Sequence, residues 1–170
     1  MDFNPPVEDV QEVELFIGAT MGEQNPGTIY TDQTGQFPVR SFHGKRYQFV
    51  AYEYRSNAIL VRALADQTDK SMLEDFQDVY DYLTKRGFQP KLNVMDNQCS
   101  KTIQNFIKMK RAEIQLVNPD NHRVNAAERA IRTWKNHWIA GLGTLDPNCP
   151  LQLWCQLIAQ GQDTLNMLQT

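Results

Sequence analysis

The chain has 170 residues, of which 41% are hydrophobic and 10% aromatic, enough apolar content for one folded domain with its own core. No apolar run reaches the roughly 18 residues of a membrane-spanning helix, and residues 1–10 lack the basic and apolar regions of a signal peptide. The three cysteines form no C-x-x-C pair and show no zinc-ligand spacing to the three histidines, which indicates reduced thiols in a nuclear or cytoplasmic protein.

The net charge of −3 is unevenly distributed along the chain. Residues 1–39 contain seven acidic residues and no Lys or Arg. Residues 40–170 therefore hold 13 acidic and all 17 basic residues, a net charge of +4. This mildly basic body is compatible with phosphate binding, although a charge of this size does not establish it.

The N-terminal part of the chain is predicted to be a lead-in followed by a meander. Residues 1–27 are acidic and rich in Pro and Gly, with Val13–Ile17 as their only apolar patch, and are expected to be largely unstructured. Three strands joined by short turns follow at Thr28–Asp32, Tyr47–Tyr54 and Ala58–Leu64. Their alternation and turn residues indicate an antiparallel meander at the start of one domain that spans residues 28–170.

The periodicity then alternates between helix and strand. Apolar residues at helical spacing predict helices at Asp69–Arg86 and Lys101–Lys110. Apolar runs predict strands at Lys91–Met95 and Glu113–Val117. Strands joined through helices pair in parallel, so these two should extend the meander into a mixed sheet.

The stretch Leu116–Trp138 carries the helix around which we expect the chain to be organised, after a break at residues 118–121. Helical spacing places Ala127, Ala130, Ile131, Trp134 and Trp138 on one apolar stripe, and Glu128, Arg132 and Lys135 on a neighbouring flank. A turn at Gly141–Gly143 and a last helix at Leu151–Leu168 follow. The element order predicts an α/β fold with a mixed five-stranded sheet flanked by helices.

Three carboxylates stand out in this arrangement. Asp32 and Asp96 each follow an apolar strand, and Glu128 lies beside the buried stripe. If the first and fourth strands are neighbours, these groups converge, and divalent cations would relieve their repulsion. Oxygen ligands favour Mg²⁺ or Mn²⁺, and two such ions can support phosphoryl displacement. The plainer interpretation is that the aspartates are ordinary turn residues and that the cations of the helix form a solvated face.

Three segments resemble the integrase catalytic core of copia-type retrotransposons and retroviruses. They are TDQTGQFPVRSFHGKRYQFVAYEYRSNAILV, MDNQCS and HRVNAAERAIRTWKNHWIAGL, and they occur in the order of that family's motifs. The resemblance implies an RNase H-like fold and a D,D,E triad of Asp32, Asp96 and Glu128 that binds two Mg²⁺ or Mn²⁺ ions. It also implies processing of element DNA 3′ ends and their joining into target DNA.

The resemblance further implies nucleic-acid contacts and self-association. The expected phosphate contacts are Lys101, Arg129, Arg132 and Lys135, with Asn97 bordering the metal site. Proteins of this family commonly form homo-oligomers. The chain lacks the family's N-terminal His/Cys zinc domain and C-terminal DNA-binding region, so an isolated core is expected to bind DNA weakly.

One departure from the family leaves two other functions open. Only 31 residues separate Asp96 from Glu128, roughly one helical turn fewer than is usual in the family. The first alternative is therefore an inactive retroelement remnant that binds nucleic acid or partner proteins, and the second is a nuclease on the same fold. By their spacing, Trp134, Trp138 and Trp154 are predicted to be core residues, and Cys99 a small buried residue rather than a nucleophile.

Overall fold

The structure is a computed structural model that describes residues 27–96, 99–117 and 126–169. The lead-in at residues 1–26, the break at 118–121 and Asn97 lie outside this description. The described elements are β1 (Thr28–Gln33), β2 (Tyr47–Glu53), β3 (Ala58–Leu64), α1 (Asp69–Lys85), β4 (Leu92–Asp96), α2 (Lys101–Met109), β5 (Glu113–Val117), α3 (Ala126–Gly143), a 3₁₀ turn (Leu151–Leu153) and α4 (Trp154–Leu168).

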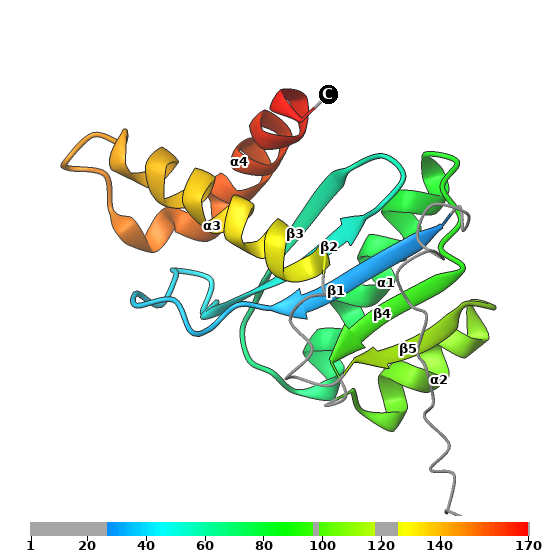
Figure 1. Ribbon diagram of the computed structural model, residues 1–170. Helices are drawn as coiled ribbons and strands as arrows, with labels where there is room; N and C mark the ends of the chain where they lie inside the picture. The colour runs from blue at the N-terminus through cyan, green and yellow to red at the C-terminus, as the bar shows by residue number, and fades with distance from the viewer. Residues whose placement is uncertain (1–26, 97–98, 118–125, 170) are drawn as a thin grey trace, which may run out of the picture.

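The five strands form one mixed sheet in the order β3-β2-β1-β4-β5, as Figure 1 shows. The pairs β1–β2 and β2–β3 are antiparallel, whereas β1–β4 and β4–β5 are parallel. The predicted mixed five-stranded sheet is thus confirmed. Because β1 and β4 are parallel neighbours, their carboxyl ends lie at the same edge of the sheet.

Helices α1 and α2 cover one face of the sheet. Both begin at a side-chain cap, where the hydroxyls of Thr68 and Ser100 accept hydrogen bonds from the backbone N–H groups of Ser71 and Ile103. Their apolar stripes complete a core with the strands, and this core contains Ile29, Phe49, Ala51, Leu60, Leu64, Phe76, Val79, Tyr80, Leu83, Met95, Ile103, Phe106, Ile107 and Ala112. The apolar residues at helical spacing in both segments are therefore buried, as predicted.

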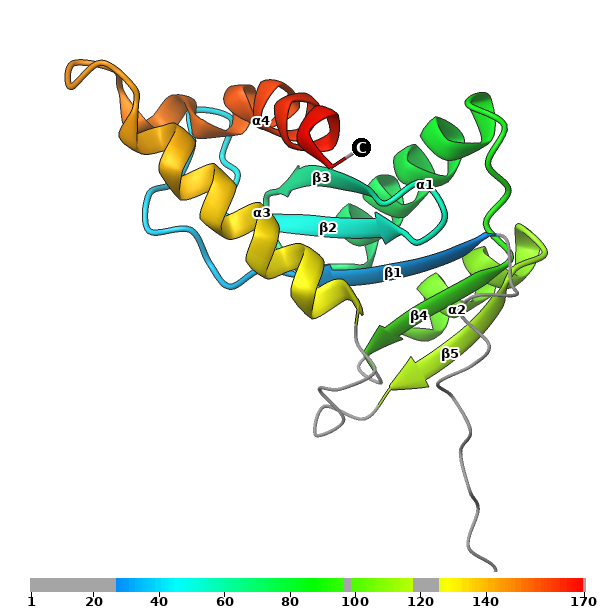
Figure 2. The same cartoon turned by 45° about the horizontal axis from the view of Figure 1, so that its top comes forward.

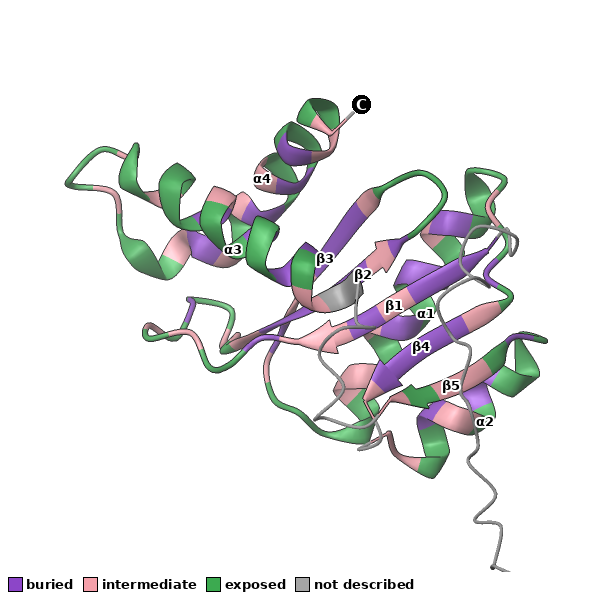
Figure 3. Ribbon diagram, viewed as in Figure 1, coloured by how far each residue is buried: buried purple, intermediate pink, exposed green. Residues whose placement is uncertain are grey.

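Helices α3 and α4 pack on the opposite face, over β1, β2 and β3, as the view in Figure 2 makes clear. Trp134 and Trp154 are fully buried there, and Trp134 stacks on Trp138 with ring centroids 5.2 Å apart. Trp134 Nε1 donates a hydrogen bond to Gln48 Oε1 at 2.7 Å, which ties α3 to β2. All three tryptophans are core residues, as predicted. Figure 3 shows buried residues along the strands and exposed ones on the outer sides of the helices.

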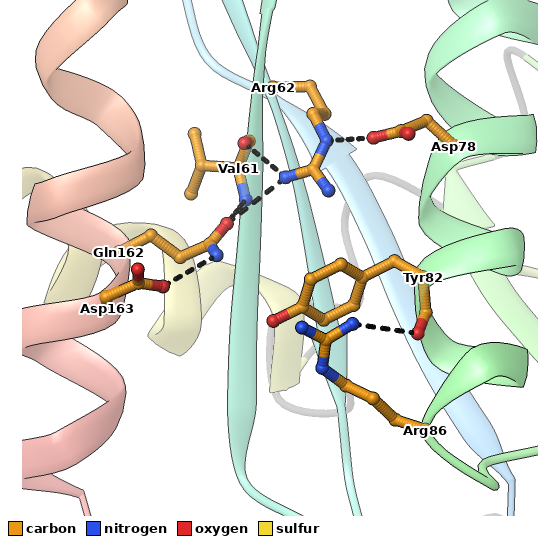
Figure 4. A network of polar contacts seen from close by, with 7 residues as sticks. All are labelled: Val61, Arg62, Asp78, Tyr82, Arg86, Gln162 and Asp163. Atoms are coloured by element: carbon orange, nitrogen blue, oxygen red, sulfur yellow. Dashed lines mark hydrogen bonds and ion pairs between the residues drawn. The ribbon is translucent and has the colours of Figure 1, made fainter.

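Helix α4 also satisfies the free edge of the sheet. The Asn166 side chain pairs with both the N–H and the C=O of Ile59 at 2.9 Å, and Gln162 Oε1 accepts from Val61 N–H at 2.9 Å. Figure 4 shows Arg62 of β3 between Gln162 of α4 and Asp78 of α1. Arg62 donates a hydrogen bond to Gln162 Oε1 and forms an ion pair with Asp78. These side chains occupy backbone groups of β3 that would otherwise be open to pairing with another strand.

Several bounds predicted from the sequence were wrong: Asp32 lies within β1, and the predicted last helix begins as the 3₁₀ turn Leu151–Leu153. The expected turn at Gly141–Gly143 is the last turn of α3. Leu142 packs against the tryptophan core, and this burial outweighs the cost of about 1 kcal/mol that each glycine imposes on a helix. Asp96 is the last residue of β4 rather than the residue after it, a shift of one position.

Gly27 is required at the start of β1. Its φ is +106°, and a Cβ atom at this position would lie 2.2 Å from the carbonyl oxygen of Gln89. Its own carbonyl accepts a hydrogen bond from Lys91 N–H at 2.8 Å, which anchors the entry to β1 beside the entry to β4. In the described part of the chain, no helix is long and apolar enough to cross a membrane.

Candidate active site

Asp32 and Asp96 lie side by side at the carboxyl ends of β1 and β4. The last paired residues of these strands are Thr31 and Met95, so the two aspartates are the next neighbours in the same register. Adjacent strands are about 4.8 Å apart, which holds the two backbones close together. Met95 points into the core beneath α1 and α2, and strand alternation therefore directs Asp96 toward the face that carries α3.

Glu128 lies in the first turn of α3, which packs across β1 and β2. The buried side chains of Ala130, Ile131 and Trp134 fix the rotation of this helix on the sheet. Glu128 is therefore positioned by the same apolar stripe that the sequence predicts, on a side chain that remains half-buried.

Asp96 and Glu128 both act electrostatically on Asp32. Burial raises the pKa of Asp32, and the negative charges of Asp96 and Glu128 raise it further. The backbone N–H of Gln33, which donates to Asp32 Oδ1 at 2.7 Å, and the ammonium group of Lys135 act in the opposite direction. Like charges from three separate elements thus meet around Asp32, and a bound cation would relieve their repulsion.

The chemistry of this donor set fits a hard divalent cation. Carboxylate oxygens without thiolates suit Mg²⁺ or Mn²⁺. Among the residues that the structure describes, however, no three His, Cys, Asp or Glu side chains come close enough together to hold a metal ion. The carboxylates are near neighbours that do not form a closed ligand set.

A cavity of about 370 Å³ opens beside the two aspartates. Its lining contains both polar and apolar residues and consists of Thr31, Asp32, Gln33, Phe49, Gln67, Asp69, Met72, Phe76, Met95, Asp96, Cys99 and Ser100. Asp69 adds a third carboxylate to this lining, from the first turn of α1. The cavity therefore connects the aspartates to the start of α1 and the segment before α2.

Sequence reasoning did not identify Gln33, Gln67 and Asp69 as lining residues of this cavity. Gln33 Nε2 lies 2.8 Å from Met72 Sδ, a contact between residues 39 positions apart. An acidic residue in the first turn of a helix is an ordinary capping feature, so Asp69 gave no distinguishing signal. The crossover from β3 to α1 brings Gln67 and Asp69 to the carboxyl ends of β1 and β4.

The predicted phosphate contacts occupy different sides of the site. Lys135 is close enough to lower the pKa of Asp32, whereas Arg129 acts on Tyr30 and Tyr52 on the neighbouring part of the sheet. Arg132 is exposed on α3, and Lys101 is exposed at the start of α2. Asn97 lies outside the described residues.

Cys99 is not a candidate nucleophile, although it lines the cavity beside the aspartates. Burial raises the pKa of the Cys99 thiol to about 11, and the charge of Asp69 adds to this effect. A thiol with this pKa stays protonated near neutral pH and is therefore inert. Cys99, Cys149 and Cys155 are all free thiols, as predicted.

Solved structures of integrase catalytic cores share this fold. The catalytic core domain of BIV integrase matches with a TM-score of 0.61 and 14% identity, over 82% of this chain and 83% of that chain. The HTLV-2 integrase catalytic core domain in complex with magnesium matches in its dimeric form (0.60, 18% identity, 82% and 84%) and its trimeric form (0.63, 20% identity, 84% and 86%). Neither the models of known protein families nor the sequences of curated proteins give a match.

The fold is therefore the RNase H-like fold of retroviral integrase catalytic cores, as the sequence motifs predict. The TM-scores of 0.60–0.63 establish the shared fold. At identities of 14–20%, the activity and the copia-type origin are proposals.

Proposed function

We propose that this chain is the catalytic core of a copia-type integrase, a metal-dependent polynucleotidyl transferase that processes DNA 3′ ends and joins them into target DNA. The observation that carries the proposal is the neighbouring position of Asp32 and Asp96 at the edge where β1 and β4 end on an RNase H-like sheet, with Glu128 close enough to raise the pKa of Asp32. Burying like charges together is unfavourable, and such arrangements are concentrated at functional sites.

In this proposal Asp32, Asp96 and Glu128 hold two Mg²⁺ or Mn²⁺ ions. The ions, when bound, supply activation of the attacking oxygen and stabilisation of the leaving oxygen. The chain itself contributes positioning. The two strand ends fix the aspartates in register, and the tryptophan-anchored helix α3 presents Glu128 from above the sheet.

The basic residues around the site would hold the DNA. Lys135 lies near the carboxylates, where it can contact the phosphate that reacts. Arg129, Arg132 and Lys101 are exposed and would contact phosphates further along the strand, with Asn97 beside the metals. Phosphate contacts of this kind determine affinity and register rather than sequence preference.

The proposed partners are element DNA ends, target DNA and further copies of this chain, in the nucleus or the cytoplasm. The solved HTLV-2 cores are described as dimeric and trimeric forms in complex with magnesium. Self-association of this chain would bring two sites together, so that two DNA ends could be joined to one target.

A strand-joining assay tests the proposal. The probe is a Y-shaped DNA in which a free 3′-hydroxyl lies next to a phosphodiester that it can attack, so that joining yields a longer labelled strand. We expect joined product with Mg²⁺ or Mn²⁺, none with EDTA, and none with the Asp96→Asn variant. Metal-dependent nicking without joined product would instead identify a nuclease on the same fold.

One observation favours the inactive remnant as a second candidate. No three metal-ligand side chains converge in the described part of the structure, and the interval between Asp96 and Glu128 is short. A remnant should bind DNA without joining or cutting it, and its melting temperature should be the same with and without Mn²⁺.

A further inference from the structure

Three tyrosines form a continuous aromatic surface beside the candidate active site, which we call the tyrosine platform. It consists of Tyr30 on β1, Tyr52 on β2 and Tyr54 directly after β2. Tyr30 and Tyr52 are direct cross-strand partners, with ring centroids 6.1 Å apart. The Tyr54 ring lies 6.3 Å from Tyr30 and 6.4 Å from Tyr52, so the three rings adjoin one another.

The tyrosine platform lies at the margin of the core, where Tyr52 is half-buried and packs against the cluster that contains Trp134 and Trp138. Tyr54 is 36% exposed, and Tyr30 is half-buried and belongs to neither core cluster. A cavity of about 580 Å³ lies beside the rings, lined by Tyr52, Tyr54, Asn57, Ile59, Arg129, Ala130, Thr133 and Gln169. Tyr52 and Tyr54 therefore border a hollow large enough for a planar group, and Tyr30 lies next to both.

A cation accompanies the rings. Arg129 is exposed and lines the same cavity as Tyr52 and Tyr54. Arg129 lies in the first turns of α3, which packs across β1 and β2, the strands that carry Tyr30 and Tyr52. Aromatic faces next to a cation are the combination by which proteins bind unpaired nucleotides, with bases stacked on the rings and phosphates on the cation.

Residues of the tyrosine platform and its cation lie next to the carboxylates on both β1 and α3. Tyr30 precedes Asp32 by two residues on β1, so strand geometry places their side chains on the same face about 7 Å apart along the strand. Arg129 directly follows Glu128 on α3. A DNA strand held at the carboxylates therefore has its neighbouring nucleotides within reach of the tyrosine platform.

We propose that the tyrosine platform binds the unpaired bases of the DNA strand next to the phosphodiester held at Asp32, Asp96 and Glu128, with Arg129 on its backbone. This inference rests on the proposed function, because that function supplies the DNA. It adds a binding surface formed by Tyr30, Tyr52 and Tyr54, which stacks bases irrespective of their sequence since every base has a π-face.

DNA binding without a divalent metal tests the tyrosine platform independently of catalysis. The probe is fluorescein-labelled oligo(dT) in EDTA, titrated with the full chain and followed by anisotropy. Tyr54→Leu should weaken binding roughly 5-fold or more, because base stacking contributes about 1–3 kcal/mol per base. Tyr54→Phe keeps the ring and should bind as the unmodified chain does.

Two further variants sharpen the test. Phe42→Leu removes an aromatic ring that is 65% exposed in the loop between β1 and β2, and should leave the affinity unchanged. Arg129→Gln should weaken binding and reduce its dependence on salt. Oligo(dT) that carries 5-iodouracil should cross-link under ultraviolet light to Tyr30, Tyr52 or Tyr54.

The outcomes separate this inference from the proposed function. Oligo(dT) binding that depends on Tyr54 supports the tyrosine platform even if the chain joins no DNA, in which case only the proposed activity fails. Unchanged affinity in Tyr54→Leu overturns the inference. Loss of self-association in Tyr54→Leu, with DNA affinity retained, also overturns it and assigns the surface to a second copy of the chain.

Discussion

Polar groups are paired in one region of the sheet and repel one another in another region. At the edge strand β3, Gln162 and Asn166 of α4 pair with outward-facing backbone groups, and Arg62 pairs with Asp78. At the carboxyl ends of β1 and β4, like charges meet and raise the pKa of Asp32. The first arrangement lowers the energy of the fold, whereas the second raises it. Stability and the proposed function are therefore assigned to different regions, and unfavourable electrostatics are typical of functional sites.

The largest effect expected from this comparison concerns the carboxylates. Asp32→Asn, Asp96→Asn and Glu128→Gln should each reduce metal-dependent joining roughly 10³-fold or more, because residues that act as a unit fail together. The same changes should leave the fold intact, and Asp32→Asn should raise the melting temperature without metal because it removes a repelling charge. Full joining activity in any one variant would contradict the triad assignment.

A smaller effect is expected at the edge strand. Asn166→Leu should lower the free energy of unfolding by about 1–3 kcal/mol, because it leaves the N–H and C=O of Ile59 without their partner. Urea denaturation measures the loss. Gln156→Leu, at an exposed position of the same helix, is the matched control and should leave stability nearly unchanged. Equal effects in the two variants would show that Asn166 has no special role.

Metal binding should stabilise the folded chain by an amount within the range expected for the edge strand. At a Mn²⁺ concentration about ten times its Kd, binding to the folded chain adds about 1.4 kcal/mol, a rise in Tm of roughly 3–6 °C. Thermal melting with and without Mn²⁺ measures it, and Asp96→Asn should abolish the rise. An equal rise in that variant would place the ion elsewhere on the protein.

The last effect is a dependence of stability on pH that arises in α1. Burial raises the pKa of Asp75 to about 7, and its Oδ2 has no hydrogen-bond partner among the described residues. The folded chain therefore holds this proton more tightly than the unfolded chain, whose aspartate has a pKa of about 3.9. The free energy of unfolding should fall as the pH rises from about 4 to about 7.

Urea titrations across this range measure that dependence. Asp75→Asn should flatten it, because the variant has no proton to lose. The exposed neighbouring variant Glu74→Gln should retain it. An unchanged slope in Asp75→Asn would assign the pH dependence to other groups, of which Asp32 has a pKa raised in the same direction.

Local patterns in the sequence were sufficient for much of the fold. The strands at Ala58–Leu64 and Glu113–Val117 have the predicted bounds, and the stripe through Trp134 and Trp138 is buried as expected. Periods of two and 3.6 residues arise from burying one face of a strand or helix, so they can be read within a window of a dozen residues. The order of the carboxylate motifs predicts Asp32, Asp96 and Glu128 as the site, and this assignment stays a prediction.

The tertiary structure decided what depends on distant residues. The pairing of Gln162 with Val61 joins positions 101 residues apart, and the cavity lining at Asp69 depends on the crossover from β3. The tyrosine platform arises because β1 and β2 pair in a register that places Tyr30 opposite Tyr52. The strand register and the crossover depend on packing across the whole core, and a short stretch of sequence is therefore not enough to predict them.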